Sequence, residues 1–226
     1  MTERPLIEWS WIAEHLDDIA FRTVQHLWLA AIAVGVGFVI SFGLSLLVVR
    51  YRRLYGPVTG VSGVLYTIPS LAMFAILVPI TGLSLLTAEI PLILYTLLIF
   101  IRNMVAGFQA VPPDVIEAAD GMGFTRARRL RAIELPLAVP LIITGVRLAS
   151  VSTIGLVMIV SLIGDNFGGL GLFIKEGIQT FFWTKVYVGT ALSLVLAFAV
   201  DAVFVAIERA ITPWTRKRAT ASPSVA

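Results

Sequence analysis

The 226-residue chain is 58% hydrophobic with a mean hydropathy of +0.93, which is too apolar for a soluble domain of this length. It contains no cysteine, so disulfides and cysteine-based metal or redox sites are excluded. The net charge of +3 could suggest a nucleic-acid partner, but in a membrane protein such an excess is typical of cytoplasmic loops. His15 and His26 do not form a spaced ligand set. We therefore expect no nucleic-acid partner, no metal site and no cofactor.

Residues 1–26 are predicted to form an external N-terminal amphipathic segment. Five acids and the lack of a compact apolar stretch argue against a signal peptide. Trp9, Ile12, Ala13 and Leu16 recur at helical spacing. Such a helix either lies on the outer face of the membrane or packs on the rest of the protein.

Five apolar runs follow, each near the roughly 20 residues that a helix needs to cross a bilayer. Small residues at Ala31/Gly35 and Ala33/Gly37 in the first run would let another helix approach closely. Pro69 should kink the second run, because proline removes one helical hydrogen bond. The predicted spans are 27–49, 58–80, 81–101, 141–163 and 186–207.

The basic residues predict the orientation of these spans. If the arginines at 50–53 face the cytoplasm, five crossings place 12 Lys and Arg residues on that side and 4 on the other. The positive-inside rule favours this arrangement over its inverse. The N-terminus is then outside and the C-terminus is cytoplasmic.

The charged segment between the third and fourth spans, residues 112–136, is predicted to form two short helices below the membrane. Asp114 and Glu117 have the spacing of a capping box that begins the first helix. Glycines, Gly123 among them, would end it. Thr125 would cap the second helix, and Pro136 would close it.

One pattern within this segment, EAADGMGFTRARRLRAIELP at 117–136, carries a specific spacing. Glutamate and two alanines precede a glycine by six, five and four residues, and Ile-x-Leu-Pro begins ten residues after it. This spacing resembles the EAA loop of ABC-importer permeases, which implies that the loop docks on an ATPase. A more ordinary interpretation is helix capping alone. The implied coupling residues are Glu117, Ala118, Ala119, Gly123, Ile133, Leu135 and Pro136.

Four further strings resemble osmoprotectant permeases, which move glycine betaine, carnitine or choline: TIPSLA (67–72), IRNMVAGF (101–108), IEAADGMGFT (116–125) and IELPLAVPLIITGVR (133–147). The segment LIGDNFGGLG (162–171) is similar to a GAGGLG-type segment of related permeases but inserts three residues. The resemblance implies an all-α integral membrane protein, the five-span type I ABC importer transmembrane domain with cytoplasmic EAA coupling helices. The permease domain would span 27–210, followed by a cytoplasmic tail at 211–226.

The chain lacks the G-x-x-x-x-G-K-[ST] loop that binds nucleotide phosphates, so it is not expected to be an enzyme. The resemblance implies partners: ABC ATPase subunits, a second permease subunit that is identical or homologous, an extracytoplasmic substrate-binding protein, and the bilayer of a bacterial or archaeal cytoplasmic membrane. The alternatives are a permease for another small solute such as methionine, or an osmolyte transporter or channel that works without ATP.

Two charges lie inside predicted spans, Arg147 in the fourth and Asp201 in the fifth. They would sit at matching depth on antiparallel neighbours and form an ion pair. Alternatively, Arg147 reaches the interface while Asp201 bonds a backbone or hydroxyl group, or Asp201 serves a substrate or proton. Aromatic faces at Tyr66, Phe74 and Tyr95 would suit a quaternary ammonium ion, but packing explains them as well, so substrate-binding residues stay unassigned.

Overall fold

The computed structural model describes residues 6–213, and every regular element in that range is helical. Residues 1–5 and most of the predicted tail, 214–226, lie outside the described residues. The elements in chain order are α1 (Trp9–Glu14), α2 (Leu16–Arg50), η1 (Arg52–Leu54), α3 (Tyr55–Thr67), α4 (Ser70–Thr81), α5 (Leu85–Gln109), α6 (Pro113–Gly121), α7 (Arg126–Arg129), the π-helical turn η2 (Leu130–Glu134), α8 (Leu135–Val160), α9 (Gly171–Gln179) and α10 (Trp183–Ile211).

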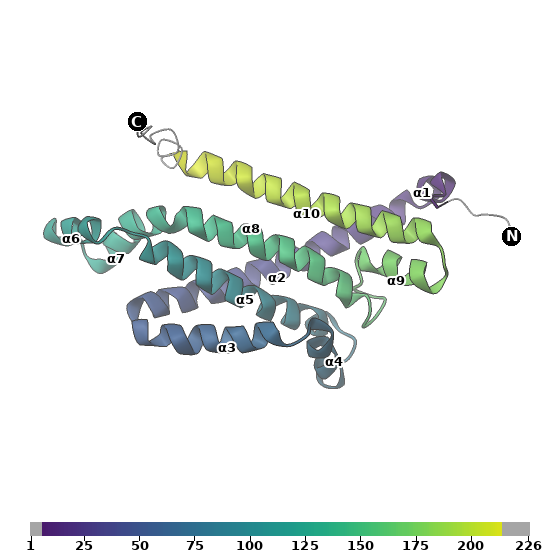
Figure 1. Ribbon diagram of the computed structural model, residues 1–226, viewed down its shortest axis with the longest axis horizontal. Coiled ribbons are helices and arrows are strands. Elements are labelled where there is room, and N and C mark those ends of the chain that lie inside the picture. The colour runs from purple at the N-terminus through teal and green to yellow at the C-terminus, as the bar shows by residue number, and fades with distance from the viewer. Residues whose placement is uncertain (1–5, 214–226) are drawn as a thin grey trace, which may run out of the picture.

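The long helices run along the length of an elongated molecule (Figure 1). Residues 112–136, the segment predicted to dock on an ATPase, are called the coupling segment and contain α6, α7 and η2. The helices α6 and α7 project at one end of the molecule, and α1 and α9 lie at the other. Four helices of the described chain are long and apolar enough to cross a membrane, and a fifth crossing results if α3 and α4 together form one span. The helix α2 contacts α5 most extensively, and α5 in turn packs along α8.

The predicted second span, 58–80, is wrong in form, because two helices bent by 91° replace one kinked helix. Pro69 has no backbone N–H and disfavours a helical conformation at the residue before it. Ile68 is accordingly extended, with φ −64° and ψ 127°. The predicted third span, 81–101, is displaced: α4 ends at Gly82 with φ +68°, Ser84 caps α5, and α5 continues to Gln109.

The single amphipathic helix predicted near the N-terminus is divided at His15. Only α1 stands apart, while Leu16 already belongs to the 35-residue helix α2 that includes the first span. Asp17 and Asp18 lie in the first turn of α2, where the positive end of the helix dipole stabilises negatively charged carboxylates. The Trp11 ring meets the edges of Phe173 and Phe182, so α1 packs against α9 and the chain that follows it.

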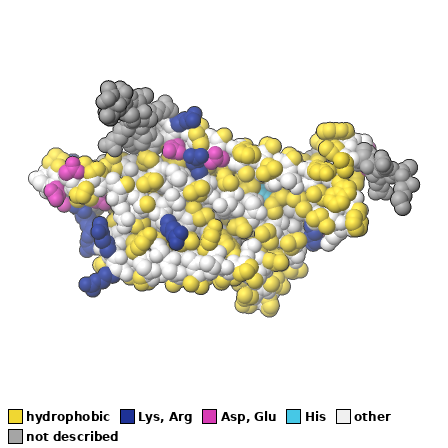
Figure 2. Space-filling view, in the orientation of Figure 1, with side chains coloured by type: hydrophobic (Ala, Val, Ile, Leu, Met, Phe, Trp, Pro, Cys, Tyr) yellow, Lys and Arg dark blue, Asp and Glu magenta, His cyan; other side chains and the backbone are white. Residues whose placement is uncertain are grey.

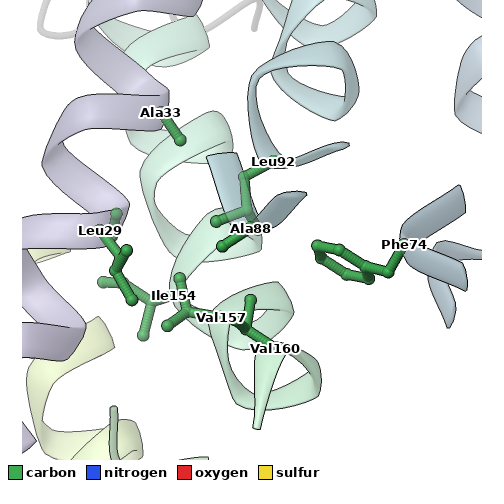
Figure 3. Packing of buried hydrophobic residues seen from close by; sticks show 9 residues of the cluster. Leu29, Ala33, Phe74, Ala88, Leu92, Ile154, Val157 and Val160 are labelled. Carbon is green, nitrogen blue, oxygen red and sulfur yellow. The ribbon is translucent and has the colours of Figure 1, made fainter. Parts of the chain in front are cut away.

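A hydrophobic cluster holds α2, α4, α5 and α8 together (Figure 3). Its members are Leu29, Ala30 and Ala33 from α2, Phe74 from α4, Ala88 and Leu92 from α5, and Ile154, Val157 and Val160 from α8. All are buried.

Of the two small-residue pairs in α2, only Ala33/Gly37 faces α5. A Cβ at Gly37 would lie 1.9 Å from the Thr96 hydroxyl oxygen, so the two helices meet at this glycine. Gly35 has nothing within 4 Å of its ideal Cβ position. With Ala31 it lines an apolar hollow of about 510 Å³ between α2, α8 and α10.

Candidate functional site

The first helix of the coupling segment, α6, begins without the predicted capping box. Its N-cap is Pro112, which makes no side-chain cap bond, and Pro113 occupies the first turn. Proline suits that position because its missing N–H would have no helical acceptor there. The Glu117 side chain is exposed and makes no hydrogen bond or ion pair within residues 6–213. Capping therefore does not account for this glutamate.

Gly123 ends α6 with a turn that favours glycine. Its φ is +77°, in the left-handed region where a Cβ is strained. The Gly123 N–H donates to the carbonyl of Asp120, and the Phe124 N–H donates to that of Ala119. These two bonds form the Schellman motif, which satisfies the last carbonyls of a helix. Ala119 is fully buried beneath this turn, whereas Ala118 is exposed.

The second predicted coupling helix does not close at Pro136. The Thr125 hydroxyl caps α7 by accepting from the Arg128 N–H at 3.4 Å, as predicted. The helix then continues through η2 into α8, forming one apolar rod from Arg126 to Val160. The π-helical turn ends at Glu134, two residues before Pro136, whose missing N–H removes one α-helical bond within that turn. The residues at the junction of η2 and α8 are thus Ile133, Leu135 and Pro136.

Arg129 joins the two arms of the coupling segment. Its Nη1 donates to both carboxylate oxygens of Asp120 at 2.6 Å, and its Nε donates to Oε1 of Glu134 at 2.7 Å. The bonds to Glu134 and then to Asp120 raise the pKa of this guanidinium above its ordinary value. These partners of Arg129 were not predicted. The sequence offers one indication of the Arg129–Glu134 pair, the five-residue spacing, which brings side chains together in a π-turn but not in an α-helix.

Arg147 meets two acids of α10. Its Nε lies 2.9 Å from Oδ1 of Asp201 and its Nη2 lies 3.2 Å from Oδ2, while Nη1 lies 3.3 Å from Oε2 of Glu208. The three side chains are 28–36% exposed. Acidic and basic groups meet beside α10 in Figure 2. Glu208 was not predicted as a partner of Arg147, although it lies seven residues after Asp201 and so on the same helical face.

The break between α3 and α4 opens a hollow of about 450 Å³. The rings of Tyr66 and Tyr95 meet edge to face there, with centroids 5.6 Å apart. The Tyr95 hydroxyl donates to the carbonyl of Ile68, the extended residue at which α3 ends. Phe74, the third candidate aromatic residue, is fully buried in the core cluster and cannot meet a ligand there.

The glycine-rich segment between α8 and α9 is joined to α2 by hydrogen bonds with three side chains, those of Arg22, Gln25 and His26. The Gln25 Oε1 accepts from the Gly169 N–H, and His26 is fully buried beside it. The Leu170 N–H donates to Nδ1 of His26, so Nε2 carries the proton and donates to the Ile154 carbonyl. Both ring nitrogens are therefore engaged in packing this segment.

Long apolar helices, a broken span and a helical loop beyond the membrane-spanning rods together define a membrane-embedded transport subunit. The family model described as the inner membrane component of binding-protein-dependent transport systems matches residues 33–213. The chain belongs to this family, and it is a multi-pass membrane protein. Members are permease subunits rather than enzymes; a substrate-binding protein and a separate ATPase, which hydrolyses ATP, complete the system.

Three relatives match nearly their whole length. The osmoprotectant import permease protein OsmW of Salmonella typhimurium is 37% identical over 200 residues, 86% of this chain and 92% of the relative. The choline transport system permease protein OpuBB of Bacillus subtilis is 31% identical, over 87% and 89%. The carnitine transport permease protein OpuCB of Listeria monocytogenes is 32% identical, over 90% and 93%.

Solved structures agree on the fold. The inward-facing MetNI methionine ABC transporter matches with a TM-score of 0.75 at 21% identity, covering 86% of this chain and 96% of that one. An amino acid ABC transporter with histidines matches with a TM-score of 0.73 at 18% identity, over 90% and 98%. The fold is therefore that of a type I ABC importer transmembrane domain, as predicted.

Proposed function

We propose that this chain is the permease subunit of an ATP-driven importer for osmoprotectants of the glycine betaine, choline and carnitine type. The observation that carries the proposal is that relatives named for these solutes are 31–37% identical over most of both chains. The hollow at the α3–α4 break supports it, because two tyrosine rings line it and no charged residue of the described chain does. Aromatic faces attract quaternary ammonium groups without requiring a carboxylate.

Coupling is proposed to run through the tip of the segment at 112–136. Glu117, Ala118 and the Gly123 turn are exposed at its far end, whereas Ala119 supports them from beneath. ATP would bring the ATPase subunits together, and the segment would move with them to expose the translocation path to the outside. Ile133, Leu135 and Pro136 would transmit that movement into α8.

The orientation and the second permease subunit complete the proposal. We assign the N-terminus to the outside and the C-terminus to the cytoplasm, which puts α6 and α7 on the ATPase side. A second copy or a homologous permease would close the path, because α10 and much of α2 are exposed in the single chain. The Arg147–Asp201 pair, with Glu208, is proposed to hold α8 to α10 within the membrane rather than to bind the solute.

The test of the substrate is transport by the complete complex in liposomes. Uptake of labelled glycine betaine, carnitine or choline should require ATP, the binding protein and the ATPase, and methionine should not compete. Tyr66→Ala should weaken transport more than Phe74→Leu does per molecule of folded complex. Competition by methionine alone would favour the amino-acid alternative.

The proposed docking of the ATPase is tested with substitutions at the exposed tip of the coupling segment. Glu117→Lys and Gly123→Pro should leave the complex in the membrane while separating ATP hydrolysis from uptake. Normal transport by both variants would remove the docking assignment. Uptake by the purified chain without any ATPase would instead favour a transporter or channel that works without ATP.

A further inference from the structure

A third hollow, of about 330 Å³, lies between the coupling segment and the ends of the membrane helices. Arg52 of η1 lines one side and Arg126 of α7 lines the other. It adjoins a further hollow that shares Arg126 and adds Arg50. Basic side chains, drawn dark blue, gather at this end of the molecule in Figure 2, and those of the described residues there are arginines.

Three arginines and one glutamate, Glu134, line this hollow, so the residues that the structure describes leave it with an excess of positive charge. Arg129 also lines it, but Asp120 and Glu134 already hold that guanidinium. Across residues 6–213, neither Arg52 nor Arg126 has a carboxylate within ion-pair distance. Two guanidinium groups from different parts of the fold therefore face one space without a counter-ion, which is the arrangement that suits a phosphate group.

The remaining walls of the two hollows are mostly apolar, apart from Tyr55, Gln109 and Glu134, the carboxylate that pairs with Arg129. Val49 and Leu46 at the end of α2 line the adjoining hollow, and Phe108 at the end of α5 lines the hollow that contains Arg52. These residues belong to helices that are apolar enough to cross the membrane, so the walls lie where a span meets the interface. A ligand that fits both kinds of wall has an anionic head and a hydrocarbon chain.

We propose that Arg52 and Arg126 bind the phosphate of an anionic phospholipid from the leaflet on the side of the coupling segment, with its acyl chains along Leu46 and Val49. Basic pockets between spans on the cytoplasmic side are known to take such headgroups. The exposed tip, with Met122 67% exposed, contributes nothing to the lining. The site is thus separate from the proposed docking surface for the ATPase, and it does not depend on which solute is carried.

The test is lipid retention by the full-length chain in its purified complex, measured by native mass spectrometry with dioleoylphosphatidylglycerol or dioleoylphosphatidylcholine. Each arginine near a membrane surface strengthens anionic lipid binding roughly fivefold, so two should favour phosphatidylglycerol roughly 30-fold. Arg52→Gln with Arg126→Gln should remove that preference, and the Lys pair at the same positions should retain most of it. Arg53→Gln is the matched control, because Arg53 neighbours Arg52 but does not line the hollow.

Three results would overturn the proposal. Equal retention of the two lipids by the wild-type chain would do so without any variant. Displacement of phosphatidylglycerol by inorganic phosphate would identify a soluble phosphate ligand instead. A double Gln variant that keeps its lipid but loses the ATPase subunit would assign the hollow to the protein partner.

Discussion

Removing the guanidinium of Arg147 should destabilise the protein more than removing either of its acids. In Arg147→Leu, Asp201 and Glu208 face the vacated position without a counter-charge. In Asp201→Asn, Arg147 keeps Glu208, and in Glu208→Gln it keeps the two bonds to Asp201. We therefore expect the order Arg147→Leu, then Asp201→Asn, then Glu208→Gln.

The magnitude follows from the exposure of the three side chains. Breaking a buried ion pair costs about 3–5 kcal/mol, whereas an exposed pair contributes at most about 1 kcal/mol. Because about a third of each side chain is exposed, Arg147→Leu should lower the free energy of unfolding by about 2–3 kcal/mol. Asp201→Asn should lower it by about 1–2 kcal/mol, and Glu208→Gln, which loses one 3.3 Å contact, by less than about 1 kcal/mol.

The assay is denaturant unfolding of the full-length chain in nanodiscs of fixed lipid composition, followed by tryptophan fluorescence. Arg102→Leu serves as a control, because Arg102 on α5 is exposed and has no ion-pair partner within residues 6–213. Adding Asp201→Asn to Arg147→Leu should recover part of the loss, although Glu208 stays unpaired. Strictly additive effects, or three equal single-variant effects, would refute the reasoning.

Three further predictions concern other parts of the fold. Gly37→Ala should lower the free energy of unfolding by about 1–3 kcal/mol, because the added Cβ meets Thr96. Gly35→Ala should be neutral or stabilising by up to about 1 kcal/mol, because the position is open. Equal values for the two variants in the nanodisc assay would contradict the α2–α5 contact at Gly37. Gly123→Ala should lower ATP-coupled uptake by complexes of equal abundance, because a side chain at φ +77° is strained by about 1–2 kcal/mol; unchanged uptake would show that the turn geometry is dispensable. In intact cells an impermeant thiol reagent should label Phe181→Cys but label Met122→Cys only after permeabilisation, and the reverse pattern would invert the proposed topology.

The number of apolar elements could be predicted from the sequence because each run has the length and uniform apolarity that a bilayer requires. The bend at Ile68 could be predicted only as a kink, because sequence shows that Pro69 removes a bond but not whether neighbouring helices fix the halves at 91°. Here the Tyr95 hydroxyl donates to the Ile68 carbonyl at the bend, and that donor lies 27 residues away along the chain.

The coupling segment shows the same division between local and distant causes. Gly123 and Thr125 could be predicted as a helix end and a helix start, because both roles depend on backbone chemistry within a few residues. The role of Pro136 could not be predicted, because the helix continues past this proline instead of ending there. The π-turn ahead of it accommodates the hydrogen bond that the proline cannot make. The ion pair between Arg129 and Asp120 forms because the turn at Gly123 brings α6 back towards α7. This pair could therefore be recognised only in the folded segment.

The continuous helix from Arg126 to Val160 has a mechanical consequence. At about 1.5 Å per residue its 35 residues extend about 52 Å, so it reaches from the coupling segment to the glycine-rich loop that Gln25 and His26 fasten to α2. A tilt of about 10° about its midpoint would displace each end by about 4–5 Å in opposite directions. Under the proposed coupling, a push by the ATPase at one membrane surface would arrive at the other as a pull on α2. The π-turn ahead of Pro136 and the interior proline Pro140 are places where the helix can bend.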